Sequence, residues 1–319
     1  MTRSRIAGTG SYLPKALLTN ADLEQRMDTT DQWIRERTGI QRRHIVAAGE
    51  TTVDMAEHAA RAALAAAGCD PKDVDLICFG TCTPDLVFPN CAVMLQARLG
   101  NHGTPALAME AACSGFIYAL SVADKFIRAG EAKRALVVGA ESLSKITNYE
   151  DRGTAILFGD GAGAVLLEAS DAPGILSTHL HADGSYIDLL KCTGGVSKGH
   201  DPRGDHITMA GSEVFKVAVT MLGKAVDEAL AANGVTREQL SWLVPHQANI
   251  RIIQATAKKL AMPMERVIVT VQDHGNTSSA SVPLALDTGV RDGRIRRGDL
   301  LLLEAFGGGF TWGSALVRY

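Results

Sequence analysis

The stretch LAMEAACSGFIYAL, residues 107–120, decides the fold expected of this chain. Residues 107–109 form a short apolar run typical of a strand, and residues 116–120 continue in a pattern typical of a buried helix. Cys113 stands between them, so we expect it on a tight turn at the N-terminus of that helix. There the helix dipole and unpaired backbone N–H groups would favour the thiolate and make Cys113 a nucleophile. A small buried cysteine packed between strand and helix is the alternative that this stretch leaves open.

The composition indicates a globular protein large enough for two domains or two fused halves. The chain has 319 residues, of which 46% are hydrophobic and 21% charged, and its formal net charge is −3. No basic excess suggests a nucleic-acid partner, and no apolar run reaches the roughly 18 residues of a membrane span.

The cysteines and the N-terminus indicate which cellular compartment to expect. The N-terminus lacks the apolar core of a signal peptide, and the six cysteines lack a paired framework, so we expect reduced thiols in the cytoplasm. Cys78 and Cys82 have no partners at zinc-finger spacing, so we expect no metal site.

Residues 28–45, DTTDQWIRERTGIQRRHI, bring Trp33 close in sequence to Arg35, Arg37, Arg42 and Arg43. A solvated helix anchored by Trp33 is one interpretation. A surface for a phosphorylated aromatic ligand is the other, because arginine pairs with phosphate and both residue types stack on flat rings. These residues alone leave both interpretations open.

Beyond residue 50, helical and short apolar segments alternate, which predicts a layered α/β fold. We expect a helix over residues 55–67 and strands over residues 74–79, 134–139, 163–168, 240–244, 267–271, 300–304 and 314–318. The segment ALAAAG at residues 63–68 recurs as ALAANG at residues 229–234, and the same offset of 166 superimposes Cys113 on Ser279. We therefore interpret the chain as two similar halves, residues 1–170 and 171–319. A Gly-rich surface loop at residues 191–205 lies in the region that joins them.

The repeat predicts a shared site between the halves. It places His246 and the loop DHGNTSSAS, residues 273–281, at strand ends equivalent to those near Cys113. A pseudo-twofold axis would then bring Cys113, His246 and Asn276 together, as one nucleophile and two polar donors. A structural histidine and a plain turn-forming asparagine are the alternatives.

Two glycine-rich segments have different expected roles. FGGGFTWGSA, residues 306–315, could bring backbone N–H groups close to a thioester as an oxyanion hole. FGDGAGA, residues 158–164, leads into a strand rather than a helix, so we do not expect it to bind a dinucleotide.

Taken together, EAACSGF, VPHQAN, HGNTSSAS and LLEAFGGGFTWGSALVRY make the chain similar to the β-ketoacyl-acyl-carrier-protein synthase III family, which initiates type II fatty-acid synthesis. The similarity extends from residue 8 to the last residue. It implies a thiolase-like α/β fold, with two pseudo-symmetric βαβα halves in a five-layered α-β-α-β-α arrangement. It also implies a cytoplasmic, homodimeric acyltransferase that acts on coenzyme A thioesters and acyl carrier protein, with no cofactor, metal, nucleic acid or membrane.

The resemblance implies a reaction and a role for each site residue. Acetyl, or another short acyl group, passes from coenzyme A to Cys113. Condensation with malonyl-acyl-carrier protein then gives acetoacetyl-acyl-carrier protein and CO2. His246 and Asn276 complete the catalytic triad, and Gly308 joins the Cys113 N–H as an oxyanion donor.

The resemblance also implies three binding surfaces. Residues implied to contact coenzyme A are Thr29, Trp33, Arg37, Arg152, Gly211 and Asn249. Residues implied to receive the carrier protein are Lys216, Gln247, Ala248, Asn249, Ile250, Arg251, Lys258 and Lys259. Residues implied to form the acyl pocket are Leu143, Phe158, Leu190, Ile207 and Phe88, of which Phe88 would reach across a dimer interface. Ser212 departs from the asparagine expected in close relatives, which puts its own contact with coenzyme A in question.

Two other classes of protein stay open. A thiolase performs Claisen chemistry without decarboxylation, but it normally needs a second catalytic cysteine near the C-terminus, and no cysteine follows residue 192. A catalytically silent carrier-binding scaffold would not need Cys113, His246 and Asn276. Asn276, where the elongating synthases would have a second histidine, favours the initiating class. No carboxylate is adjacent in either the His246 or the Asn276 motif, which suits loss of CO2, and the pocket residues suggest a short straight primer.

Overall fold

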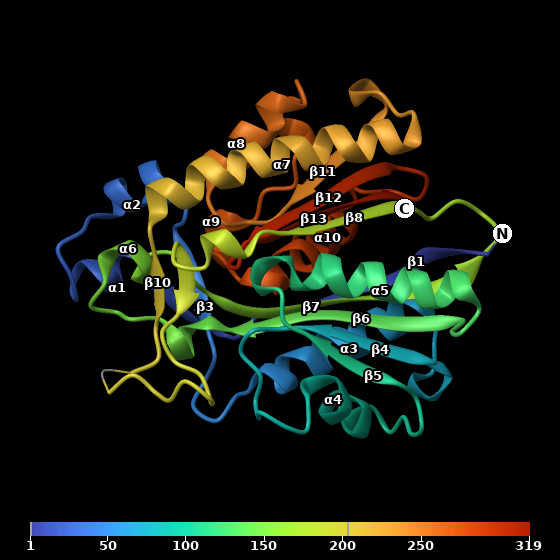
Figure 1. The fold of residues 1–319 in the computed structure, drawn as a ribbon, viewed down its shortest axis with the longest axis horizontal. Coiled ribbons are helices and arrows are strands. Elements are labelled where there is room, and N and C mark those ends of the chain that lie inside the picture. Colours follow the sequence, from blue (N-terminus) through green and yellow to red (C-terminus); the bar gives the residue numbers. More distant parts are fainter. Residues whose placement is uncertain (1, 203) are drawn as a thin grey trace.

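The computed structural model describes residues 2–202 and 204–319, which form two β-sheets packed between layers of helices (Figure 1). The first sheet has the strand order β1-β7-β6-β4-β5, made of Arg3–Tyr12, Asp160–Ser170, Arg134–Ser142, Leu76–Gly80 and Ala106–Met109. The second has the order β8-β13-β12-β11, made of Ile175–Ala182, Thr311–Arg318, Leu300–Gly307 and Trp242–Pro245. Corresponding neighbours pair in the same sense in both sheets: two antiparallel pairs are followed by a parallel pair.

Six helices form the three helical layers. They are α3 (Thr52–Ala67), α4 (Cys91–Leu99), α5 (Gly115–Ala129), α7 (Gly211–Asn233), α8 (Ile250–Lys259) and α10 (Ser281–Arg291). Helix α3 covers the outer face of the first sheet with α4 beside it, and α7 covers the outer face of the second sheet with α8 beside it. Helices α5 and α10 lie between the sheets and contact strands of both (Figure 1). The five-layered thiolase-like arrangement is thus confirmed.

The middle layer is held by apolar side chains that its two helices bury against both sheets. Phe116 and Leu120 of α5 and Val282 and Leu286 of α10 are fully buried in one cluster that includes strands of both sheets. An apolar helix face is stable only where other elements cover it. These two helices therefore require both sheets.

The internal repeat appears in the element boundaries. Strand β4 begins at Leu76 and β11 at Trp242, while α5 begins at Gly115 and α10 at Ser281, so both pairs show the offset of 166. Strand β7 ends at Ser170 and β8 begins at Ile175, which is where the chain passes from the first sheet to the second. A division into residues 1–170 and 171–319 stays our interpretation.

The structure also contains shorter strands and helices besides these layers. Two small hairpins are formed by β2 (Ala16–Thr19) with β3 (Arg42–Ile45), and by β9 (Leu190–Cys192) with β10 (Ile207–Met209). The short helices are α1 (Asn20–Glu24), α2 (Asp31–Thr38), α6 (Arg152–Ala155) and α9 (Val271–His274). Among the described residues, no helix is both long and apolar enough to cross a bilayer.

The predicted strand over residues 267–271 is wrong. Only Val267 forms a bridge, to Leu243 of β11, and α9 begins at Val271. The backbone N–H groups of Thr270 and Val271 donate to the side-chain oxygen of Gln247, at 2.8 and 3.1 Å, instead of to a neighbouring strand. A side-chain acceptor therefore ends the strand pairing. The other predicted strands are present, and most are longer than expected.

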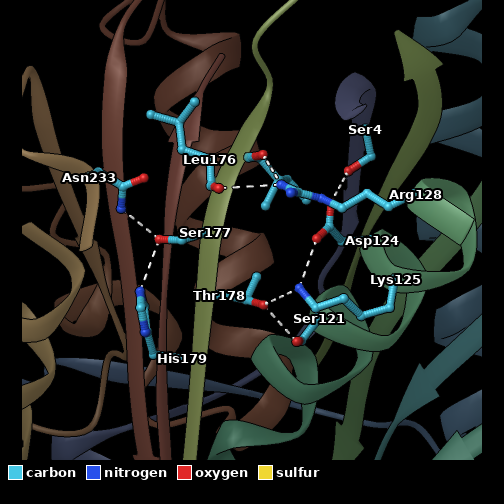
Figure 2. A network of polar contacts seen from close by, with 11 residues as sticks. Ser4, Ser121, Asp124, Lys125, Arg128, Leu176, Ser177, Thr178, His179 and Asn233 are labelled. Carbon is cyan, nitrogen blue, oxygen red and sulfur yellow. Dashed lines mark hydrogen bonds and ion pairs between the residues drawn. The ribbon is translucent and has the colours of Figure 1, made fainter. Parts of the chain in front are cut away.

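A polar network ties α5 to both sheets (Figure 2). The carboxylate of Asp124, fully buried on α5, accepts hydrogen bonds from Ser4 Oγ of β1 at 2.6 Å and from Arg128 Nε at 2.9 Å. Arg128 also donates to the carbonyl of Ile175, at the start of β8, at 2.6 Å. Asp124 thus joins α5 to β1 directly and holds Arg128, which in turn bonds the start of β8.

We predict that Asp124→Ala lowers the free energy of unfolding by about 2–4 kcal/mol, because it leaves buried donors without their acceptor. Lys125→Ala is the matched control. Its ammonium also pairs with Asp124, at 3.1 Å, but from an exposed position, so its loss should cost less than about 1 kcal/mol. Urea denaturation of both variants tests the pair, and equal losses would contradict the assignment.

Candidate active site

One cavity of about 1090 Å³ brings the three predicted catalytic side chains together. Cys113, His246 and Asn276 all line it. Cys113 lies in the 3-10 turn η2 (Ala112–Ser114) that precedes α5, His246 follows β11, and Asn276 follows α9. The site therefore draws one residue from the first half of the chain and two from the second, as the repeat predicted.

The nucleophile turn packs against its counterpart in the other half. Turn η2 contacts the 3-10 turn η7 (Ser278–Ala280), which precedes α10. Ala112 and Ser278, 166 residues apart, both have left-handed backbone, with φ of 43° and 49°. Non-glycine residues adopt this conformation only where the surroundings enforce it. The two strained turns therefore show the internal repeat, and both lie at the site.

Glycines let the backbone close around Cys113. A Cβ atom on Gly307, at the end of β12, would lie 2.5 Å from the Cys113 backbone N. A Cβ on Gly139 would lie 2.3 Å from the carbonyl oxygen of Ser279 in η7. Real Cβ atoms do not approach backbone this closely, so these positions require glycine. Gly308 follows directly and lines the cavity. Its role as an oxyanion donor together with the Cys113 N–H stays a prediction.

Burial, rather than the helix dipole, decides the protonation of Cys113. The thiol is only 8% exposed, and burial raises the pKa of Cys113 to about 12. A hydrogen bond with Ser278 offsets only part of that effect. The expectation that the helix dipole favours the thiolate is therefore wrong, because burial outweighs it. A neighbouring base has to take the proton when the thiol reacts.

His246 is available as that base because burial keeps it neutral. Burial lowers the pKa of His246 to about 3. Its backbone N–H donates to the carbonyl of Glu304 at 2.8 Å, and its ring Nδ1 is hydrogen-bonded to Ser281 Oγ. The Ser281 oxygen already accepts the Gln247 N–H, at 3.3 Å. When the Ser281 oxygen accepts from Nδ1–H, Nε2 is free to act as a base. When the Ser281 hydroxyl donates to Nδ1, the ring proton sits on Nε2, the tautomer able to donate to a ligand.

Asn276 is oriented by backbone and side-chain bonds. Its N–H donates to the Leu157 carbonyl at 2.8 Å, and its own carbonyl accepts from the Gly159 N–H at 3.0 Å. Its Oδ1 accepts from the Ser278 N–H at 2.9 Å. The amide oxygen is thus engaged by the protein, which leaves Nδ2 as a donor for a ligand.

A buried arginine, Arg43, packs against Gly275, the residue that precedes Asn276. Arg43 is fully buried, and its guanidinium donates to Asn20 Oδ1 at 2.7 Å and to the Ile156 carbonyl. Its stem leaves no room at Gly275, where a Cβ would lie 2.9 Å from Arg43 Cγ. Burial lowers the pKa of Arg43 to about 10. The sequence left Arg43 open to a place on a solvated helix or on a ligand surface, but the structure places it in the core.

The residues implied to bind coenzyme A surround Trp33 at the outer end of the cavity. Arg37 and Arg152 place their guanidinium carbons 5.0 and 4.7 Å from the Trp33 ring centroid. Asn249 Nδ2 donates to the Arg37 carbonyl at 2.9 Å. Trp33, Arg37, Gly211, Ser212 and Asn249 line the cavity, whereas Thr29 and Arg152 lie outside its lining. An aromatic ring could enter between Trp33 and Arg152 only if the guanidinium moves off the indole.

One of the implied carrier-protein residues, Gln247, does not lie at the surface. Arg251 lies on α8 with its guanidinium over the Phe215 ring, and Lys259 pairs with Asp227 at 2.7 Å. Gln247 is 1% exposed, and its amide bonds the backbone at Pro245, Ile268, Thr270 and Val271. Assigning Gln247 to the docking surface is therefore wrong, because its side chain holds the loop beneath the site.

Four of the five acyl-pocket residues line the cavity: Leu143, Phe158, Leu190 and Ile207. Phe88 is 83% exposed and does not line it. A role for Phe88 across a dimer interface stays a prediction. The loop between β9 and β10, which was predicted at the surface, also borders the cavity through Gly194, Val196 and His200.

Three polar residues at the site were missed from the sequence: Ser278, Ser281 and Glu141. The repeat offset of 166 could have identified Ser278, because it pairs Ser278 and Ser279 with Ala112 and Cys113 of turn η2. Glu141 could have been noticed as a carboxylate at the end of an apolar strand. Ser281 gave no signal, since its role depends on a contact with His246 across 35 residues.

A five-layered α/β fold with a buried Cys-His-Asn cavity defines the class of thiolase-fold condensing enzymes. The comparisons with known proteins identify the family. Residues 107–184 match the model for 3-oxoacyl-[acyl-carrier-protein] synthase III, and residues 230–319 match the model for its C-terminal part. The chain belongs to the β-ketoacyl-acyl-carrier-protein synthase III family.

Full-length relatives and solved structures agree with this assignment. The chain is 62% identical to the synthase III of Alkalilimnicola ehrlichii, with 100% of both chains covered. It resembles the crystal structure of the Aquifex aeolicus synthase III, with a TM-score of 0.94 and 48% identity over 99% of this chain and 100% of that one. The priming β-ketosynthase of the R1128 polyketide pathway matches with a TM-score of 0.94 and 38% identity, covering 99% and 96%.

We predict that Gly307→Ala lowers the rate of acyl transfer about 10²-fold, because the added Cβ must displace the Cys113 backbone N. Gly184→Ala is the matched control, since a Cβ there meets no atom within 4 Å. Formation of acyl-enzyme from acetyl-CoA, followed by intact mass, measures the effect. Full activity of Gly307→Ala would show that the close approach can relax.

Proposed function

We propose that the chain initiates fatty-acid synthesis by condensing a short acyl group from coenzyme A with malonyl-acyl-carrier protein. The observation that carries the proposal is the presence of Cys113, His246 and Asn276 in one cavity of a chain 62% identical, over its full length, to a named synthase III. The direct test is incubation with acetyl-CoA, which should add one acetyl group to Cys113 and release free coenzyme A.

The first half-reaction is acyl transfer. Because burial holds both Cys113 and His246 neutral, His246 takes the thiol proton as the sulfur attacks the thioester carbonyl. The N–H groups of Cys113 and Gly308 then stabilise the developing oxyanion. The carbonyl re-forms, coenzyme A leaves as thiolate, and the proton held by His246 returns to it.

The second half-reaction is decarboxylative condensation. The malonyl thioester places its carbonyl oxygen against His246 Nε2–H and Asn276 Nδ2, two neutral donors that stabilise the enolate formed as CO2 leaves. The enolate carbon attacks the acyl-Cys113 carbonyl, the carbon–sulfur bond breaks, and the Cys113 thiolate takes up a proton from solvent. No metal or cofactor is needed, because the thioester activates the acyl group and loss of CO2 supplies the carbanion.

The residues around the same site suit particular binding partners. The aromatic and cationic entrance at Trp33 and Arg37 suits coenzyme A, and Arg251 on α8 suits an acidic carrier protein. We further propose that the chain works in the cytoplasm as a homodimer in which Phe88 contacts the partner subunit. The primer is expected to be short and straight. Turnover of acetyl-, isobutyryl- and octanoyl-CoA would rank the primers.

We predict that Asn276→Ala still acetylates Cys113 but loses condensation by about 10²–10³-fold, because one donor to the enolate is gone. Intact mass follows acetylation, and CO2 release from labelled malonyl-acyl-carrier protein follows decarboxylation. Cys113→Ala is the control that should fail to acetylate. Failure of Asn276→Ala to acetylate would instead assign Asn276 to the thiol.

We predict that Arg251→Glu raises the KM for malonyl-acyl-carrier protein while acetyl-CoA transfer changes little, because Arg251 is exposed on α8, where its charge attracts an acidic carrier protein. Lys72→Glu is the matched control, with the same charge change at an exposed position of the other half. Steady-state kinetics with each substrate distinguish the effects. Equal damage to both substrates by Arg251→Glu would contradict a separate docking surface.

A further inference from the structure

The start of α5 departs from the usual pattern of a capped helix. Ser114 occupies the N-cap position of α5 and is fully buried, yet its side chain makes no capping hydrogen bond to the helix. An N-cap serine normally accepts from the backbone N–H two or three residues later. Here the Ser114 hydroxyl instead donates to the backbone carbonyl of Thr311, the first residue of β13, at 2.8 Å. Its hydrogen bond therefore joins the first half of the chain to the second.

Thr311 bonds back to the turn that holds the nucleophile. Its hydroxyl donates to the carbonyl of Ala111 at 2.8 Å. The same carbonyl accepts the Ser114 N–H at 3.0 Å, the bond that closes the turn around Cys113. Each hydroxyl has one proton, and the two shortest contacts use one proton each. Ser114 and Thr311 therefore form a reciprocal pair of hydrogen bonds between turn η2 and β13, with Ser114 Oγ and Thr311 Oγ1 3.0 Å apart.

This pair adjoins the loop that carries the proposed oxyanion donor. Residues 308–310 connect β12 to β13, and Thr311 pairs with Gly307 across this hairpin. Gly307 is the glycine whose backbone packs against the Cys113 backbone N. Thr311 Oγ1 also lies 3.4 Å from the carbonyl oxygen of Gly308. The place of Gly308 relative to Cys113 is thus set by close packing at Gly307 and by the two hydroxyls at Thr311.

We propose that Ser114 and Thr311 are positioning residues for the oxyanion hole: their reciprocal bonds hold the Gly308 loop against turn η2, so that the N–H groups of Gly308 and Cys113 meet at one oxygen. The inference rests on the proposed function, from which it takes these two donors. An oxyanion donor acts only once charge develops on the acyl oxygen. Loss of the pair should therefore slow attack on an acyl carbonyl and leave other reactions of the Cys113 thiol unchanged.

The test compares two reactions of the same thiol in the full chain. With p-nitrophenyl acetate, the Cys113 sulfur attacks a carbonyl, an oxyanion forms, and nitrophenolate leaves. With iodoacetamide, the sulfur displaces iodide from a CH2 group, and no oxyanion forms. Both reactions need the thiol to lose its proton, so the ratio of their rates reports on the oxyanion hole. Peptide mapping assigns the products, since Cys82 and Cys192 also line the cavity.

Thr311→Val keeps the branched shape of the side chain and removes its hydroxyl. We expect it to slow acylation by p-nitrophenyl acetate about tenfold to a hundredfold, while alkylation by iodoacetamide keeps its rate. Thr311→Ser restores the hydroxyl and should recover most of the acylation rate. If alkylation falls as far as acylation, the pair holds the nucleophile itself and the proposal is overturned.

Thr288→Val is the matched control. The Thr288 hydroxyl donates to the Leu284 carbonyl at 2.8 Å within α10, and Thr288 does not line the cavity. The same change of side chain is therefore made away from the nucleophile turn. Both rates should stay at those of the unsubstituted chain.

Ser114→Ala tests the other bond of the pair. It should slow acylation selectively as well, and adding Thr311→Val should slow it little further, since either loss already releases the loop. Full acylation by Ser114→Ala, or two effects that multiply in the double variant, would show that the bonds share no constraint and would contradict the proposal. If Thr311→Val does not fold, the ratio of acylation to alkylation in Ser114→Ala decides alone.

These outcomes are separate from those of the proposed function. A chain in which Thr311→Val selectively slows acylation by p-nitrophenyl acetate, but which never accepts acetyl from acetyl-CoA, would refute the condensing activity and leave the positioning role standing. A chain that condenses normally, with both rates of Thr311→Val falling equally or not at all, would refute only the positioning role.

Discussion

The backbone-to-backbone packing of the two turns η2 and η7 is the contact on which the rest of the structure depends. Each turn ends a strand-to-helix connection in its own half, and each contains a residue with left-handed backbone. Glycines at 139 and 307 permit the approach, because any side chain there would collide with the opposing turn. The middle helices start from these turns, so the same contact sets the positions of α5 and α10 and the location of Cys113.

Burial gives the site its chemical character. A thiol with its pKa raised to about 12 beside an imidazole with its pKa lowered to about 3 cannot form a resting ion pair. Both groups are neutral when they meet an acyl thioester, and a neutral imidazole is also the form that donates to an enolate. The dry cavity therefore keeps His246 neutral in both half-reactions: Nε2 is free as a base in the first and carries the ring proton as a donor in the second.

Much of this was predictable from local patterns and the repeat. Apolar periodicity located most strands, and the offset of 166 was enough to bring Cys113, His246 and Asn276 together. The missed features depend on contacts between distant segments. Gln247 reads as part of a surface motif, yet its amide ends the strand pairing near Thr270. Whether Arg43 is exposed, or whether a dipole outweighs burial at Cys113, is decided by the surrounding packing, which periodicity does not describe.

The shared middle layer has a consequence for how the protein is made. Helix α5 is complete by residue 129, but strands β12 and β13, which help enclose it, end only at residue 318. During synthesis the first half therefore leaves the ribosome with an apolar helix face that nothing yet covers. Such intermediates aggregate readily. Folding must wait for the last strands, so a C-terminal truncation of a few residues endangers the whole molecule rather than one end of it.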